Sequence, residues 1–295
     1  MVESMLKVAL IDLIGLTYDG ETLSKRGLGG SESAIILMAK ELARVGLSVT
    51  VYNNCEDNDC SPGIYDGVEY RPVYKIQNYN DIYDIVVSSR TIMPFVPPKY
   101  WNDFNPNPNM FLHIIKQAKL KVVWLHDTFC SGDHLLEELV AEGHIDELFT
   151  LSDFHTSYIT TCAHGNKRNF EVLKDKIFMT RNGIVKYKDY VDITQKDRDL
   201  FVYNASVTKG MLPLVKNIWP EIKKHIPSAK LKVIGGYYRF RSNGEPDEQE
   251  KTWWNLVNDP RYRDLDIEFT GIIRQSEIAD ILSNASFMLY PGAFP

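Results

Sequence analysis

The feature that most constrains the fold of this chain is a strand–loop–helix–strand unit within residues 201–236. Residues 201–203 form a short apolar run of β-favouring side chains. Apolar residues then recur at helical spacing over 212–226, with lysines on the opposite face, and residues 230–234 supply a second strand. Two strands joined by a helix over so short a stretch are parallel neighbours with a right-handed crossover. The sequence therefore predicts an α/β fold with a parallel sheet.

Lys209 lies in the polar loop between the first of these strands and the helix. Open α/β sheets bind ligands at the carboxyl ends of their strands, and the free N–H groups of a helix N-terminus favour anions. A lysine at this place is suited to a phosphate group. A solvated loop lysine is the alternative interpretation.

The Tyr-Asn-Ala-Ser motif at 203–206, followed by Lys209 and the helix and strand, resembles the donor-binding half of family-4 retaining glycosyltransferases of GT-B fold. The resemblance implies that Lys209 contacts the diphosphate of a nucleotide sugar. It also implies that Ser206, Gly235 and Gly236 line the nucleotide-sugar cleft. Many members carry an arginine a few residues before the lysine, and here that place holds a tyrosine, so one phosphate contact is missing or supplied elsewhere.

The composition is typical of a globular protein with two α/β domains: 295 residues, 44% hydrophobic and 24% charged. The formal net charge of −6 argues against a nucleic-acid partner, because binding to a phosphate backbone needs a concentrated basic surface. No apolar run reaches the length of a membrane-spanning helix, and the N-terminus lacks a signal-peptide pattern. We predict a cytoplasmic protein without a transmembrane segment, and leave open a peripheral association with a membrane.

The cysteines do not form a metal-site pattern. Cys55 and Cys60 lie close together in an acidic loop, but no second pair or histidine follows at zinc spacing. The acidic residues of this loop also lack the spacing of a calcium-binding loop. We predict reduced thiols, no metal and no cofactor.

Residues 6–13 form a nearly continuous apolar run, which is typical of a strand buried in a parallel sheet. A long loop over residues 14–30 follows, and its last part is rich in glycine. The pattern then predicts a helix that is capped by Ser31 and has Glu32 favourably placed for the helix dipole.

The glycine-rich loop does not fit a dinucleotide-binding fingerprint, and this disfavours a nicotinamide-dependent oxidoreductase. Gly27 comes well after the strand that ends at Leu13, and Glu32 occupies the place of the last glycine. In family-4 enzymes a Gly-Gly pair lies between the first strand and the first helix, with N–H groups facing the donor. The resemblance implies that Gly29 and Gly30 bind the donor phosphate. A flexible surface loop with a helix cap is the alternative.

His126 and Asp127 stand at the carboxyl end of a predicted strand, residues 121–125. A neutral histidine at the ligand edge of a parallel sheet hydrogen-bonds a sugar hydroxyl well, and Asp127 is placed to orient a neighbour. The Val-Trp-Leu-His-Asp run resembles the family's strand end, where a histidine contacts the donor sugar near the reacting carbon. The resemblance implies catalytic roles for both residues, and a structural histidine is the alternative.

Other strand ends carry weaker signals. The strand at 82–88 is followed by Arg90, which either lines the cleft or is an exposed arginine without a special role. The proline-rich segment 94–109 is predicted to be a loop or a poorly ordered insertion. Ser152 is placed to cap a helix or to line the cleft, and His155, which has no evident partner, is interpreted as structural.

The predicted domain boundaries follow from a turn and a polar stretch. Asn182 opens an Asn-Gly turn that the family carries before its interdomain linker, and the resemblance places it in the cleft. The family's acidic residue after this turn is replaced by Val185. We expect an N-terminal, acceptor-side Rossmann-like domain at 1–186, a linker at 187–199 and a nucleotide-sugar-binding domain at 200–295.

The end of the chain departs most from the family. Ile272 and Ile273 follow a predicted strand at the place where family members meet the nucleotide base. After the next strand, at 286–290, the family continues into a segment with two glutamates that hold the reacting sugar and the ribose. Neither glutamate is present, so the resemblance implies a chain truncated before this segment.

The sequence as a whole predicts a GT-B protein with two Rossmann-like α/β domains facing across a cleft, the second incomplete. The implied activity is transfer of a sugar from a nucleotide diphosphate sugar to a carbohydrate, lipid-linked or other hydroxyl acceptor, with retention of configuration. A non-catalytic nucleotide-sugar-binding protein or an inactive fragment is the first alternative. A nicotinamide-dependent oxidoreductase is the second.

Overall fold

The computed structural model describes residues 5–56, 59–103, 108–128, 130–163, 166–167, 170–189, 191–235 and 248–292. The chain divides into two compact units. The first consists of Met1–Thr22 and Gly29–Ile184, and the second consists of Leu23–Leu28 and Val185–Pro295. The short segment Leu23–Leu28 therefore groups with the second unit, although the sequence analysis assigned it to the first domain.

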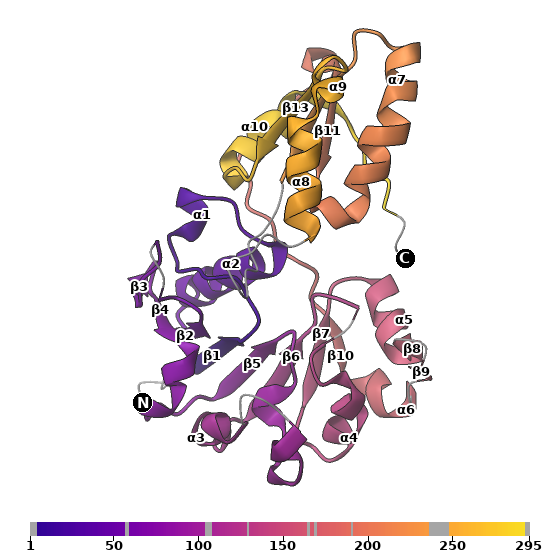
Figure 1. The fold of residues 1–295 in the computed structure, drawn as a ribbon. Helices are drawn as coiled ribbons and strands as arrows, with labels where there is room; N and C mark the ends of the chain where they lie inside the picture. Colours follow the sequence, from indigo (N-terminus) through magenta and orange to yellow (C-terminus); the bar gives the residue numbers. More distant parts are fainter. Residues whose placement is uncertain are drawn as a thin grey trace. The chain divides into compact units, whose positions relative to one another are not determined.

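The first unit is built on an eight-stranded sheet in the order β10-β7-β6-β5-β1-β2-β4-β3. Every neighbouring pair is parallel except β3 with β4. Figure 1 shows the indigo strand β1 between β2 and β5. The strands are β1 (Lys7–Asp12), β2 (Ser48–Asn53), β3 (Gly63–Tyr65), β4 (Val68–Pro72), β5 (Ile85–Ser89), β6 (Leu120–Trp124), β7 (Glu147–Thr150) and β10 (Ile177–Met179).

The predicted buried strand at 6–13 is confirmed, because β1 is parallel to both of its neighbours and almost wholly buried. Helices and short turns connect the strands of this unit. The helices are α2 (Gly30–Arg44), α3 (Leu112–Ile115), α4 (Leu136–Ala141), α5 (Asp153–Thr161) and α6 (Phe170–Leu173), and a small antiparallel pair is formed by β8 (Cys162–Ala163) and β9 (Asn166–Lys167). Helix α1 (Thr22–Lys25) begins at the last residue of Met1–Thr22 and otherwise groups with the second unit.

The start of α2 differs from the prediction. Gly29 is the N-cap, with φ −62° and ψ 155°, and its carbonyl accepts a 2.9 Å hydrogen bond from the backbone N–H of Ser33. The helix therefore begins two residues before a cap at Ser31 would allow, and Ser31 lies inside the first turn. Local sequence favoured serine as a cap, but tertiary contacts of Glu32, described below, set the entry of the chain.

The proline-rich segment 94–109 is not an unstructured insertion in its described part. It folds into short 3₁₀ turns at Met93–Phe95, Pro98–Asp103 and Pro108–Phe111. Phe95, Val96 and Phe111 are almost completely buried in the core of the first unit. Proline punctuates the backbone locally, but the burial of these apolar side chains decides where the segment lies.

The second unit has a four-stranded parallel sheet in the order β13-β12-β11-β14. Its strands are β11 (Asp197–Asn204), β12 (Lys230–Ile234), β13 (Ile267–Gly271) and β14 (Ala285–Met288), and its helices are α7 (Trp219–His225), α8 (Glu248–Asn258), α9 (Pro260–Arg263) and α10 (Gln275–Asn284). Wider helical turns at Val207–Met211 and Leu214–Ile218 lead into α7. The predicted strand–loop–helix–strand unit is confirmed, since β11 and β12 are parallel neighbours.

The predicted linker at 187–199 is too long at its C-terminal end. Strand β11 begins at Asp197, which pairs with Ala285 of β14. The polar residues at this end of the strand are exposed, so their sequence has no apolar signature. Pairing with a strand far along the chain decides their conformation.

Both sheets contain a topological switch point. In the first unit β2 and β5 lie on opposite sides of β1, and in the second β12 and β14 lie on opposite sides of β11. The connections that leave the carboxyl ends of the two adjoining strands then diverge and leave a crevice, which is where open α/β sheets bind ligands. The fold therefore marks one edge in each unit as a candidate site.

Candidate functional site

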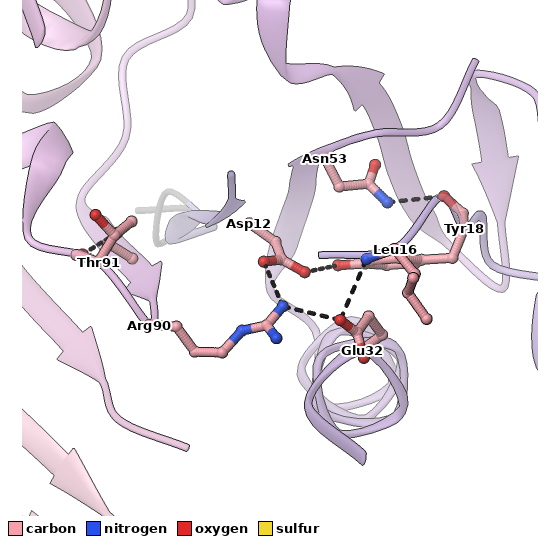
Figure 2. A network of polar contacts seen from close by, with 8 residues as sticks. Asp12, Leu16, Tyr18, Glu32, Asn53, Arg90 and Thr91 are labelled. Carbon is pink, nitrogen blue, oxygen red and sulfur yellow. Dashed lines mark hydrogen bonds and ion pairs between the residues drawn. The ribbon is translucent and has the colours of Figure 1, made fainter. Parts of the chain in front are cut away.

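An arginine held between two carboxylates occupies the switch point of the first unit. Nη2 of Arg90, which follows β5, lies 3.0 Å from Oδ1 of Asp12 at the end of β1 and 2.9 Å from Oε1 of Glu32 in the first turn of α2. Figure 2 shows the guanidinium reaching between the two carboxylates. The three side chains thus join a strand, the next strand in the sheet and a helix N-terminus.

This ion-pair cluster is almost free of solvent: the side chains of Arg90, Asp12 and Glu32 are 12%, 0% and 5% exposed. Burial raises the pKa of Asp12, an effect that the Arg90 charge opposes and the Glu32 charge reinforces. Burial by itself would lower the pKa of Arg90, but the two carboxylates outweigh it and the pKa is raised. Removing one partner of such a buried cluster leaves an uncompensated charge, which is strongly unfavourable.

The carboxylates of the cluster also hold the loop that follows β1. The hydroxyl of Tyr18 donates to Oδ2 of Asp12 at 3.1 Å, and the backbone N–H of Leu16 donates to Oε1 of Glu32 at 3.2 Å. The side chain of Asn53, at the end of β2, donates to the carbonyl of Tyr18 at 2.7 Å (Figure 2). Tyr18 is completely buried, and its burial raises the pKa of the hydroxyl, so it stays a neutral donor.

Arg90 has an unusual backbone for its residue type. Its φ is 63°, in the left-handed region that costs a non-glycine residue about 1–2 kcal/mol. The conformation is held by hydrogen bonds from its N–H to the carbonyl of Trp124 at 3.0 Å and from the N–H of Ser131 to its carbonyl at 2.8 Å. Strained residues that their surroundings hold in this way cluster at functional sites.

Glycines make room for the two carboxylates. A methyl group added at Gly15 would overlap Oδ2 of Asp12, and one added at Gly29 would overlap Oε2 of Glu32. Neither glycine has a left-handed φ, so close approach of a side chain is the reason for glycine at both positions. Gly30 is different, because an added methyl group there meets no atom within 4 Å.

Alanine at Gly29 is expected to lower the free energy of unfolding by about 1–2 kcal/mol, because its methyl group would collide with Glu32. Alanine at Gly30 is the matched control: it retains the same backbone N–H and is expected to stabilise α2 by up to about 1 kcal/mol. Urea unfolding of the two variants measures the difference. Equal stabilities would contradict the close approach of Glu32 to Gly29.

His126 lies beside this cluster, just after β6. Neither ring nitrogen has a hydrogen-bond partner among the residues that the structure describes, although both are buried. Burial, with smaller contributions from Arg90 and His155, lowers the pKa of His126 to about 3. The ring contacts Trp124, with 4.5 Å between the centroids. A buried neutral imidazole with two unused nitrogens calls for an explanation, and a ligand hydroxyl would supply one.

Asp127 contacts its neighbour His155 through its backbone. The residue is exposed, and it is its backbone carbonyl that makes a contact, 2.8 Å from Nε2 of His155. Nδ1 of His155 accepts from the backbone N–H of Leu151 at 3.3 Å. His155 therefore has two partners and ties the loop after β6 to the loop after β7, which supports its structural interpretation.

Ser152 caps α5, as the first of its two predicted roles required. Its hydroxyl oxygen accepts a 3.1 Å hydrogen bond from the backbone N–H of His155, three residues later. Asn182 is exposed, and the left-handed residue at this bend is Arg181 with φ 58°. The predicted Asn-Gly turn is thus absent from the described residues 181–187, which carry no regular hydrogen-bonded turn.

Lys209 occupies the switch point of the second unit. Its backbone leaves helical values, with φ −91° and ψ 37°, and Gly210 takes a left-handed φ of 97°. A methyl group at Gly210 would lie 2.5 Å from the carbonyl oxygen of Pro291, just after β14. The loops after β11 and β14 therefore meet at this glycine. The Lys209 side chain is exposed and makes no ion pair within the described part of the chain.

The other predicted site residues of the second unit differ in their contacts and burial. The carbonyl of Ser206 accepts from the Tyr203 hydroxyl at 2.8 Å and from the Lys209 N–H at 3.0 Å, so Ser206 shapes the lysine loop. Gly235 has φ 103°, and an added methyl would lie 2.9 Å from the Ala205 carbonyl. Ile272 is 40% exposed after β13, and Ile273 packs partly into the core. Gly236 lies outside the described residues.

Sequence reasoning missed the cluster of Asp12, Glu32 and Arg90 as a unit. Each residue had a local signal, since Asp12 ends an apolar strand, Arg90 follows another and Glu32 sits in a helix's first turn. No local pattern, however, pairs residues that are 58 and 78 positions apart. A charged residue at the carboxyl end of each of two buried strands is the signal that could have pointed to this edge.

The described residues show neither a metal-binding cluster nor a membrane-spanning helix. No group of three or more histidine, cysteine, aspartate or glutamate side chains is arranged to hold a metal ion. No described helix combines the length and apolar character needed to cross a membrane.

Comparison with solved structures identifies the fold. Anabaena HepE in complex with UDP and glucose is 14% identical, and the match covers 98% of this chain and 75% of HepE with a TM-score of 0.55. An α-glucosyltransferase in complex with UDP-glucose and DNA containing an abasic site is 15% identical over 99% of this chain and 74% of its own, with a TM-score of 0.53. WaaG, a glycosyltransferase involved in lipopolysaccharide biosynthesis, is 13% identical over 97% of this chain and 75% of its own, with a TM-score of 0.52. No protein-family model and no curated protein matches the sequence significantly.

The likeness confirms the predicted α/β, GT-B fold class. At identities this low it shows the fold alone, because one fold carries many chemistries. The expectation that this chain has no nucleic-acid partner is not supported, since one protein of the same fold was solved with DNA.

Proposed function

We propose that this chain transfers a sugar from a nucleotide diphosphate sugar to a hydroxyl group of an acceptor, with retention of configuration. The observation that carries the proposal is Lys209: an exposed ammonium without an ion-pair partner in the described chain, at the switch point of a parallel sheet. Such a place suits a phosphate group. The fold likeness supports the same substrate class, because HepE and the α-glucosyltransferase were solved with UDP and UDP-glucose.

In this proposal Lys209 stabilises the diphosphate leaving group. Negative charge builds up on the diphosphate as the glycosidic bond breaks, and a fixed cation next to it lowers the energy of that transition state more than that of the ground state. Ser206 and Gly235 shape the loop that presents the lysine. We assign the nucleotide to the same edge, with Ile272 and Ile273 next to the base.

His126 orients the donor sugar in the first unit. Because its pKa is about 3, the ring is neutral at physiological pH and offers one donor and one acceptor nitrogen. A sugar hydroxyl uses both kinds of partner. The N–H groups of Gly29 and Gly30 at the start of α2 are assigned to the donor as well, and the exposed residues Asp127 and Asn182 to the rim of this site.

The test is a binding and turnover screen with the full chain. Calorimetric titration with UDP, GDP and ADP is expected to give micromolar binding of one of them, and the matching nucleotide sugar should release its nucleotide when sugars or lipid-linked sugars are supplied as acceptors. Proton NMR of the product then reports the anomeric configuration. Binding without transfer or hydrolysis would favour a nucleotide-sugar-binding protein, and no binding of any nucleotide would overturn the proposal.

A further inference from the structure

We propose that Arg90 is the positioning residue of this site, which balances the charges of Asp12 and Glu32 and thereby fixes the loop between them. The inference rests on the proposed function in one respect: the loop ends at Gly29 and Gly30, whose N–H groups are assigned there to the donor. The distances, burial and charge of the cluster carry the inference itself.

The side chain of Arg90 connects the two ends of one loop. The loop begins directly after Asp12, the last residue of β1, and ends at Gly29, the N-cap of α2. One nitrogen of Arg90 bonds Asp12 on one side and Glu32, in the first turn of α2, on the other. This one guanidinium therefore bridges the two ends of the loop.

The same carboxylates bind the inside of the loop. Asp12 accepts from the hydroxyl of Tyr18, and Glu32 accepts from the backbone N–H of Leu16. These hydrogen bonds need oxygens that act as acceptors, as ionised carboxylates do. A neutral carboxyl group, or a glutamine in its place, still offers an acceptor oxygen, so the course of the loop depends on the side chains of Asp12 and Glu32 staying in position.

The charges cannot stay as they are without Arg90. One guanidinium and two carboxylates carry a net charge of −1, and loss of the cation would leave two like charges in a site that is about nine-tenths buried. Buried like charges are relieved by proton uptake. The other titratable groups that face the cluster are Tyr18 on the loop, Tyr70 on β4, which contacts Tyr18, and His126 after β6.

The test compares Arg90→Gln with the double variant Arg90→Gln/Glu32→Gln. The single variant has a net charge of −2 in the cluster and the double variant has −1 again. We expect Arg90→Gln to raise the dissociation constant for UDP on the order of tenfold at pH 8, because the loop is displaced. At pH 5 the loss should be smaller, since proton uptake by one carboxylate relieves the repulsion. The double variant should bind more tightly than the single variant at pH 8 and lose this pH dependence.

Two further variants separate charge from shape. Arg90→Lys keeps the cation and is expected to recover part of the binding. Arg44→Gln removes an exposed arginine from the other end of α2, where it pairs with Glu41, and is the matched control that should behave as the wild type. A double variant that binds no better than Arg90→Gln at pH 8 would overturn charge balance as the role of Arg90.

The pH dependence of unfolding gives a readout that needs no ligand. If the folded state of Arg90→Gln raises the pKa of a carboxyl group, the free energy of unfolding of this variant falls as the pH rises through that pKa. The deficit in free energy of unfolding of Arg90→Gln against the wild type should therefore be smaller at pH 5 than at pH 8. The deficit of the double variant should be the same at both pH values. Parallel profiles for all three proteins would overturn the inference. If the wild type binds no nucleotide, the proposed function fails, but the pH dependence of unfolding still tests the role of Arg90. If Arg90→Gln does not fold and the double variant does, the inference is supported.

Discussion

Replacing Lys209 with alanine is expected to lower the rate of sugar transfer by about 100–1,000-fold. The reason is electrostatic. The side chain is the cation that the switch point of the second unit presents without an ion-pair partner in the described chain, so its loss leaves the developing diphosphate charge uncompensated. The rate with the nucleotide sugar identified by the binding screen measures the effect.

The size and origin of the effect are separable by two controls. Lys216→Ala removes an exposed lysine from the helical segment that follows the same loop and should leave the rate unchanged. Lys209→Arg keeps the charge and should retain more activity than alanine. The weakening of UDP binding by salt should be less steep in Lys209→Ala than in the wild type, because one charge contact is gone. If Lys209→Ala transfers sugar as fast as Lys216→Ala, the diphosphate does not lie at this loop.

The elements of this fold were readable from the sequence wherever one face or both faces of an element are apolar. Strand β12 has the predicted bounds, residues 230–234. Hydrophobic periodicity carries this information locally. Strand β11 was predicted too short for the opposite reason, since its first residues are polar and are held only by pairing with β14.

The candidate site divides in the same way. Lys209 and His126 could be selected as candidates because a parallel strand places the residues that follow it at the ligand edge, which is a rule of order along the chain. The cluster at the ends of β1 and β5 was not predicted, because the contacts of Arg90 are with Asp12 and Glu32, which lie far away in the sequence. Glu32 was interpreted through the helix dipole alone, while the structure shows it buried, paired and holding the loop.

Gly29 illustrates how one residue satisfies two explanations. The sequence attributed the glycine to a backbone N–H that faces a phosphate, and that remains a proposal. The structure adds a second cause, because the carboxylate of Glu32 occupies the space of a side chain at this position. A glycine pair in a loop therefore predicts close approach, but the sequence does not tell whether a ligand or the protein itself approaches.

Replacing His126 with asparagine is expected to reduce the loss in free energy of unfolding that the protein undergoes as the pH falls below about 6.5. The pKa of His126 is lowered to about 3 in the folded chain, whereas an unfolded histidine titrates near its ordinary value of 6.5. Between these values the unfolded chain binds a proton that the folded chain does not, so the wild type loses stability as pH falls. The loss from this residue amounts to about 2 kcal/mol at pH 5 and about 3 kcal/mol at pH 4, relative to pH 8.

Urea unfolding of wild type and His126→Asn at pH 8, 5 and 4 measures this contribution as the change in their stability difference with pH. Other groups titrate in both proteins and cancel in that difference. The free energy of unfolding of the variant should rise relative to that of the wild type as the pH falls, whatever its value at pH 8. A difference that stays constant from pH 8 to pH 4 would mean that the folded chain protonates His126 as readily as the unfolded chain does, and burial would then not keep the ring neutral.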